Sequence, residues 1–122
     1  MKLLVIIAHG SRLESSNKEI QNLAEKLIIN NIDDNLKITY AFLELCEPTI
    51  YKSIKNEIVN GCNEIEVFPY FLAAGKHVKD DIPKEIDKLK EEYPDIKFKI
   101  LPHLGSCKEI VPLIFSQLQD KE

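Results

Sequence analysis

The sequence lacks the features that mark several common functional classes. It has no cluster of Lys and Arg, since 16 basic residues stand against 20 acidic ones and the formal charge is −4. Nucleic-acid-binding domains normally carry a basic face or tail, so nucleic acid is not an expected partner. The longest apolar stretch, residues 3–8, falls far short of the roughly 20 residues that cross a bilayer. We therefore expect neither a membrane span nor a signal peptide.

Cysteine is also scarce. Cys46, Cys62 and Cys107 form no Cys-x-x-Cys pair of the kind that binds zinc or exchanges disulfides. We expect a cytoplasmic protein whose three thiols are small, buried or half-buried hydrophobic groups. With 122 residues the chain needs neither disulfides nor a structural metal to fold, which predicts a single domain over residues 1–122.

Short apolar runs alternate with stretches of helical period, which predicts an α/β domain. The expected strands cover residues 2–8, 36–42, 65–71 and 96–101. The first and third strands are mostly apolar, as in parallel strands covered on both faces. In the second and fourth strands, apolar residues alternate with polar ones. Right-handed crossovers then favour a four-stranded parallel sheet of order 2-1-3-4 with helices on both faces, a three-layer αβα sandwich.

Capping and proline patterns predict where the helices between these strands begin. The predicted starts are Ser16 with Glu19, Glu47 with Pro48, Asp80 or Asp81 with Pro83, and Ser106 with Glu109. The last helix carries a broad apolar stripe, made of Ile110, Val111, Leu113, Ile114, Phe115 and Leu118. That stripe is wider than packing on its own sheet requires.

All three histidines follow predicted strands. His9 comes directly after the first strand, His77 lies in the loop after the third, and His103 follows the fourth. Glu44 stands at the end of the second strand. Ligands of open parallel sheets bind outside the carboxyl ends of the strands, so this edge is the candidate site. His103, beside Pro102, is better explained as a turn residue.

The segment His9-Gly10-Ser11-Arg12 is typical of an anion-binding loop. Arg12 is the only arginine among the 16 basic residues, and arginine suits two-pronged recognition of carboxylate or phosphate. The alternative is a solvated loop arginine, with Gly10 supplying a turn and Ser11 a local cap. For His9 the alternative, a satisfied buried histidine, is the less favoured interpretation.

The second histidine, His77, lies between Lys76 and Lys79 just before a predicted helix. The helix dipole and the two lysines disfavour imidazolium there, and a neutral imidazole is what a metal ligand or general base requires. In the alternative reading the lysines form an ordinary solvated face.

Missing motifs narrow the chemistry further. The chain has no Gly-x-Gly-x-x-Gly, no Walker phosphate loop and no Gly-x-Ser-x-Gly elbow, which argues against nucleotide binding and serine hydrolysis. Ala8 stands where a histidine phosphatase carries Arg. Two histidines and one glutamate remain, and these ligands suit a divalent transition metal.

Three motifs, in this order, resemble the class II tetrapyrrole chelatases, specifically the short single-domain sirohydrochlorin cobaltochelatases. They are Ala-His-Gly-Ser-Arg at 8–12, Phe-Leu-Glu-x-x-Glu-Pro at 42–48, and Pro-x-Phe-Leu-x-x-Gly-Lys-His-Val-x-x-Asp-Ile-Pro at 69–83. The resemblance covers nearly the whole chain. It implies the four-stranded chelatase-like half-domain that the strand pattern also predicts.

The resemblance implies a lyase that inserts Co²⁺ into sirohydrochlorin during cobalamin biosynthesis, with cobalt as the substrate metal and no organic cofactor. His9 and His77 would bind the metal and accept protons, and Glu44 would be an acidic group at the metal site. It is left open whether Glu44 touches the metal. The residues expected to meet the substrate and its carboxylates are Gly10, Ser11, Arg12, Lys76 and Lys79. Many relatives carry Arg where this chain has Lys76, so bidentate carboxylate recognition is not expected at that position.

Two alternatives stay open beside this function. Imidazole and carboxylate ligands also suit iron and nickel, so the enzyme could insert Fe²⁺ for sirohaem, or Ni²⁺. A non-catalytic carrier of metal or tetrapyrrole would use the same ligands. In either case a tetrapyrrole disc is wider than the mouth of one such sheet, and longer relatives join two domains around their cleft. We therefore predict a two-fold homodimer whose carboxyl-end loops face each other.

Overall fold

Four strands form one parallel sheet of order β2-β1-β3-β4 in the computed structural model, which describes residues 1–119. The strands are β1 (Lys2–Ala8), β2 (Leu36–Phe42), β3 (Glu64–Pro69) and β4 (Lys97–Ile100). Val5, at the centre of β1, is paired with Thr39 of β2 and Val67 of β3. The predicted strand order and fold class are confirmed, and all four carboxyl ends lie at the same edge.

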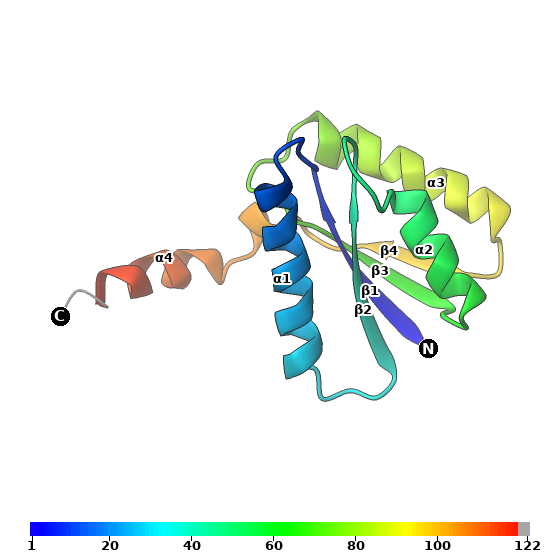
Figure 1. Cartoon of the computed structure of the whole chain (residues 1–122), viewed down its shortest axis with the longest axis horizontal. Coiled ribbons are helices and arrows are strands. Elements are labelled where there is room, and N and C mark those ends of the chain that lie inside the picture. The colour runs from blue at the N-terminus through cyan, green and yellow to red at the C-terminus, as the bar shows by residue number, and fades with distance from the viewer. Residues whose placement is uncertain (120–122) are drawn as a thin grey trace.

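Helices cover the two faces of the sheet unequally. As Figure 1 shows, α1 (Glu14–Asn30) lies on one face, and α2 (Ile50–Val59) and α3 (Ile82–Glu92) lie on the other. The chain after β4 forms a short 3-10 turn, η2 (Leu104–Ser106), and then α4 (Ile110–Gln119), which projects away from the sheet. None of the helices within residues 1–119 is long and apolar enough to cross a membrane.

The core lies between the sheet and the α2/α3 layer. Alternate residues of β1, namely Leu3, Val5 and Ile7, point to this side and are wholly buried. The helices contribute Ile50, Ile54, Ile82, Ile86 and Leu89 to the same cluster. Each fully buried aliphatic side chain contributes about 1.5–3 kcal/mol, so this layer fixes the sheet and its carboxyl edge.

Two predicted helix starts are wrong because other polar groups organise the turns. Ser16 lies inside α1, which begins at Glu14 without a side-chain cap. The turn before it is held by Asn17, whose amide exchanges hydrogen bonds of 2.7 and 3.0 Å with the backbone of Ser11. In α2 the cap is Thr49, whose Oγ1 accepts from the backbone N–H of Lys52, so Pro48 precedes the helix instead of entering its first turn.

The later helix starts also differ from expectation. Asp81 stands at the N-cap position of α3, as one of the two predicted residues, but its side chain makes no capping hydrogen bond. A π-helical turn, η1 (His77–Asp81), leads into the helix, and Pro83 lies in its first turn as predicted. Ser106 does not cap α4, because its hydroxyl donates to the carbonyl of His103 within the η2 region, 2.8 Å away. The strands β3 and β4 are shorter than predicted, although Tyr70 and Leu101 still donate to Ile7 and Val67 beyond their ends.

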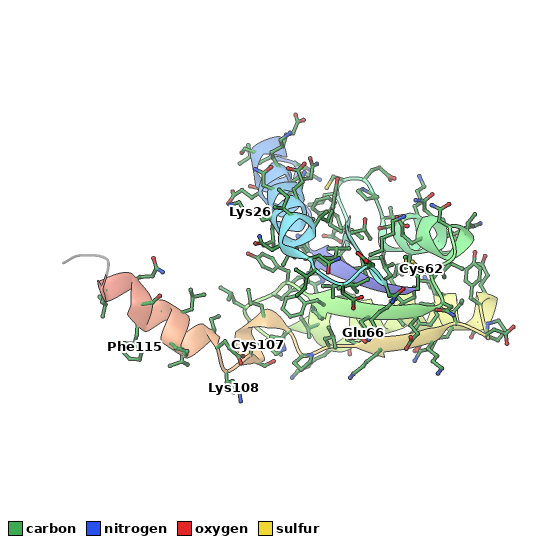
Figure 2. All side chains as sticks on the ribbon, turned by 90° about the horizontal axis from the view of Figure 1, so that it is seen from below. Lys26, Cys62, Glu66, Cys107, Lys108 and Phe115 are labelled. Atoms are coloured by element: carbon green, nitrogen blue, oxygen red, sulfur yellow. The ribbon has the colours of Figure 1, made fainter. Side chains whose placement is uncertain are left out.

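The three cysteines are free, with Cys62 buried and Cys46 and Cys107 half-buried, as predicted. Figure 2 places Cys62 in the body of the domain and Cys107 at the base of the projecting α4. Burial raises the pKa of the Cys62 thiol, which keeps it protonated and unreactive near neutral pH.

We expect Ile54→Ala to lower the free energy of unfolding by about 2–5 kcal/mol, because Ile54 is completely buried and truncation leaves a cavity. Val59→Ala, at the 72% exposed end of the same helix, is the control and should change it by less than about 0.5 kcal/mol. Urea unfolding measures both. Equal losses in the two variants would contradict the assigned core.

Candidate active site at the carboxyl edge of the sheet

Two histidines meet at the carboxyl ends of the adjacent strands β1 and β3. His9 directly follows β1, and His77 opens η1 after the β3 loop. Their ring centroids are 4.7 Å apart, with the planes tilted by 53°. The side chains are 41% and 38% exposed, so both rings remain open to a ligand. The strand order therefore brings together the pair that the sequence singled out.

The His9 ring lies between two oxygen acceptors. Its Nδ1 is 2.8 Å from the carbonyl oxygen of Gly10, and its Nε2 is 3.0 Å from Oε2 of Glu44. Carbonyl and carboxylate oxygens only accept, so both contacts are hydrogen bonds only when the ring carries two protons. A metal ion that binds Nε2 of His9 must displace any proton on that nitrogen. Glu44 is close enough to interact with the proton or with the metal ion.

The His77 ring is held from one side only. Its Nδ1 lies 2.7 Å from Oδ2 of Asp81, four residues on along the same helical turn. This contact fixes the proton on Nδ1 in the neutral ring and leaves Nε2 as the lone-pair nitrogen. Within residues 1–119 Nε2 has no hydrogen-bond partner. It is therefore available to a metal ion or a proton.

Asp81 is the site residue that sequence reasoning missed, because it was considered only as a helix cap. Its other oxygen, Oδ1, accepts from Nζ of Lys76 at 2.8 Å. The hydrogen bond from Lys76, and then that from His77, hold the pKa of Asp81 below its usual value. The same carboxylate raises the pKa of Lys76. The i, i+4 spacing of His77 and Asp81 is the signal that could have revealed this pair.

Gly10 allows the loops after β1 and β2 to approach each other. The backbone N–H groups of Leu43 and Glu44 donate to the carbonyls of Ala8 and His9. Gly10 has φ +95°, and a Cβ there would lie 1.9 Å from the carbonyl oxygen of Glu44. Only glycine fits both conditions. Gly10 therefore allows Glu44 to lie beside His9, whether or not Gly10 also contacts substrate.

The other predicted residues are less closely assembled. Ser11 organises its own loop, since its Oγ accepts from the backbone N–H of Leu13. Arg12 and Lys79 are exposed and form no ion pair within the described chain. Lys76 forms an ion pair with Asp81. The sequence placed His77 between two lysines, but the charged group that contacts its ring is the Asp81 carboxylate. His103 has no ring contact or hydrogen bond to the histidine pair in residues 1–119.

The site is open and does not form a closed metal cage. Among residues 1–119 no three His, Cys, Asp or Glu side chains are grouped closely enough to hold an ion. A hollow of about 370 Å³ lies next to the pair, with Glu44, Asp81, Lys84 and Glu85 among its lining residues. A histidine pair beside an acidic hollow suits a metal ion that is bound and then passed on.

Comparison with known proteins connects this geometry to a family. The CbiX family model matches residues 3–121. A sirohydrochlorin cobaltochelatase of Methanopyrus kandleri is 38% identical over 113 residues, which are 93% of this chain and 77% of that protein. The one of Methanococcus maripaludis is 42% identical over 84 residues, which are 69% of this chain and only 57% of that protein.

A solved structure shows the same fold within a longer chain. It is the sirohydrochlorin chelatase SirB from Bacillus subtilis subspecies spizizenii, in complex with cobalt, with a TM-score of 0.84 and 28% identity. The match covers 98% of this chain but 50% of that one. This chain therefore corresponds in length to half of that protein.

The close approach at Gly10 predicts that Gly10→Ala lowers the free energy of unfolding by about 2 kcal/mol or more, through backbone strain and the clash with Glu44. Gly75→Ala is the matched control, because an added Cβ meets open space there. Thermal or urea unfolding compares the two. A Gly10→Ala protein as stable as Gly75→Ala would refute this tight contact.

The lowered pKa of Asp81 predicts a pH-dependent contribution to stability. Because the folded-state pKa lies below the unfolded value of about 3.9, the contribution is present above that pH and is lost as the pH falls through the folded pKa. Asp81→Asn should therefore be less stable than wild type at pH 7, with the difference fading at acid pH. Asp80→Asn serves as the neighbouring control in urea unfolding. An Asp81→Asn deficit that persists unchanged in acid would exclude the ionised carboxylate as its source.

Proposed function

This chain belongs to the CbiX family, and on that premise we propose that it is a sirohydrochlorin cobaltochelatase, a lyase that inserts Co²⁺ into sirohydrochlorin on the route to cobalamin. The observation that carries the proposal is the facing pair His9 and His77 at the carboxyl edge of the sheet, 4.7 Å apart between ring centroids. Cobalt is a substrate here. Residues 1–122 serve as one chelatase-like domain, and the free thiols fit a reducing cytoplasm.

Insertion requires two separate tasks of the site. The ion must exchange its water ligands first for protein ligands and then for the pyrrole nitrogens. The macrocycle must lose its two inner N–H protons. The Nε2 atoms of His77 and His9 bind the incoming ion, with Glu44 close enough to ligate it or to neutralise its charge. The histidine pair is half-exposed, and no further side chains in residues 1–119 complete the coordination of an ion. The ion is therefore held loosely enough to pass to the macrocycle.

Each histidine then accepts one pyrrole proton. When the ion passes to the macrocycle, Nε2 of His77 becomes free to take a proton, and the resulting imidazolium is stabilised by Asp81. His9 takes the second proton, and its imidazolium donates to Glu44 and to the Gly10 carbonyl. One Co²⁺ enters, two protons leave through the imidazoles to solvent, and the charge balances.

The basic residues around the pair face the carboxylates of the macrocycle. Arg12 and Lys79 are exposed and are the stronger candidates for this contact. The backbone of Gly10 and Ser11, next to Arg12 in the chain, would join them. Lys76 reaches a substrate carboxylate only by releasing Asp81, with which it forms a 2.8 Å ion pair. Its main contribution in the free protein is to position that carboxylate behind His77.

We further propose that the working unit is a two-fold homodimer. One domain offers half of the cleft that a tetrapyrrole disc needs, and this chain corresponds to half of the cobalt-bound SirB chain. Two copies whose carboxyl edges face each other would place both histidine pairs around one macrocycle. Self-complementary pairing of this type is the commonest oligomer symmetry.

The function is tested by following the visible spectrum of excess sirohydrochlorin and Co²⁺ mixed with a small amount of protein. Many turnovers per site are expected for wild type, and insertion should fall at least about 100-fold in His77→Ala, which removes a ligand and base. His103→Ala, outside the pair, is the control and should retain activity.

Two results would overturn the proposal. Stoichiometric uptake without turnover would make the protein a carrier of metal or tetrapyrrole. Faster insertion of Fe²⁺ or Ni²⁺ than of Co²⁺ under matched conditions would reassign the metal while leaving the histidine pair in place.

A further inference from the structure

Asn17 is a buried polar side chain that the proposed mechanism does not use. It is 9% exposed and is the fourth residue of α1, a place where asparagine is less favourable than alanine or leucine. Its Oδ1 accepts from the backbone N–H of Ser11 at 3.0 Å, and its Nδ2 donates to the Ser11 carbonyl at 2.7 Å. Both polar groups of the amide are therefore directed at one residue of the short loop that joins β1 to α1 in Figure 1.

The peptide group between Gly10 and Ser11 links this amide to the first histidine. The bond is trans, and a trans peptide is planar, with its C=O and N–H pointing in opposite directions. The N–H of this group is that of Ser11, which Asn17 holds. Its carbonyl is that of Gly10, which lies 2.8 Å from Nδ1 of His9. Because the group is rigid, the bond to Asn17 on one side also sets the direction of the acceptor that meets the His9 ring on the other.

Glycine at position 10 leaves this peptide group with little local restraint. Gly10 has φ +95° and no Cβ, so its backbone can rotate more freely than that of any other residue type. The Ser11 hydroxyl does not supply the restraint, since it accepts from the backbone N–H of Leu13. In the part of the chain that the structure describes, the backbone N–H of Ser11 donates to Asn17. The buried amide therefore provides the restraint that the glycine backbone lacks.

We propose that Asn17 is a positioning residue, which keeps the Gly10 carbonyl on Nδ1 of His9 so that Nε2 is the nitrogen presented to the metal ion. The inference rests on the proposed role of His9 as a metal ligand. A hydrogen bond at Nδ1 places the proton of the neutral ring on that nitrogen and fixes the direction of the ring. Nδ1 of His77 meets Asp81 in the same way. Both histidines thus present Nε2, one held by a carboxylate and the other by a backbone carbonyl that α1 keeps in place.

Asn17 also organises the turn before α1, and a loss of stability in an Asn17 variant would fit either role. The two roles differ in what they do to metal affinity. If Asn17 acts through the His9 ring, its effect on Co²⁺ binding disappears once that ring is removed. If it only supports the fold, its effect on Co²⁺ binding is the same with and without the ring.

The test is a double-mutant cycle on the full chain, with Co²⁺ alone as the probe. The visible absorption of the bound ion gives the Kd for the wild type, Asn17→Ala, His9→Ala and the double variant. Ser53→Ala is the matched control, because Ser53 in α2 is 7% exposed and donates one buried hydrogen bond to the Tyr40 carbonyl. Far-ultraviolet circular dichroism confirms folding. If Asn17→Ala fails to fold, Asn17→Leu, a good helix former of similar size, takes its place.

We expect Asn17→Ala to raise the Kd for Co²⁺ at least about 10-fold, as when a group that orients a metal-binding histidine is lost, and Ser53→Ala to change it less than about 2-fold. In the His9→Ala protein, adding Asn17→Ala should have no further effect. An Asn17→Ala protein that binds Co²⁺ as tightly as the wild type would overturn the inference. So would an equal loss of affinity with and without His9.

Cobalt insertion into sirohydrochlorin by the wild type is scored separately. A protein whose Co²⁺ affinity depends on Asn17 through His9, but which does not turn over, contradicts the proposed function and leaves this inference in place. A protein that turns over, but whose Co²⁺ affinity is independent of Asn17, contradicts this inference alone.

Discussion

The parallel pairing of β1 with both β2 and β3 is the constraint on which the site depends. Because β1 is central and in matched register with its neighbours, the residues that follow the three strands emerge at one edge. His9, Glu44 and His77 are distant in sequence, and the strand order brings them to this edge. The buried side chains between the sheet and the α2/α3 layer hold this arrangement in place, and glycine at position 10 lets the first two loops come into contact.

Carboxylates contact the two histidine rings through different nitrogens. Asp81 contacts Nδ1 of His77 and leaves its Nε2 open, whereas Glu44 contacts the Nε2 of His9 itself. In the proposed mechanism, an ion that binds His77 meets an open ring nitrogen, whereas an ion that binds Nε2 of His9 must displace the Glu44 contact. Under the proposed function, the exposed Arg12 and Lys79 would contact the anionic macrocycle beside this cation site, although the net charge of the chain is negative.

Sequence patterns predicted the strands and their order because apolar runs and right-handed crossovers leave few alternatives. They also placed His9, Glu44 and His77 at one edge, since the position of a residue after a strand determines where it emerges. The predicted caps Ser16 and Ser106 were wrong. Asp81 stands at the predicted N-cap position but contacts Lys76 and His77 instead of the helix backbone, because spacing along the chain does not report such partners. Before α4 projects from the sheet, Gly105 lies close to the backbone of Leu72 in the loop after β3, a tertiary contact that spacing along the chain does not report.

The central claim is that one Co²⁺ ion is bound jointly by His9 and His77 before it reaches the macrocycle. A crystal structure of the protein soaked with Co²⁺ alone tests it most directly. The account predicts an ion within ordinary imidazole bonding distance, about 2.1 Å, of Nε2 of both rings, with Asp81 still holding Nδ1 of His77. An ion bound at His103, or by carboxylates without either histidine, would contradict it.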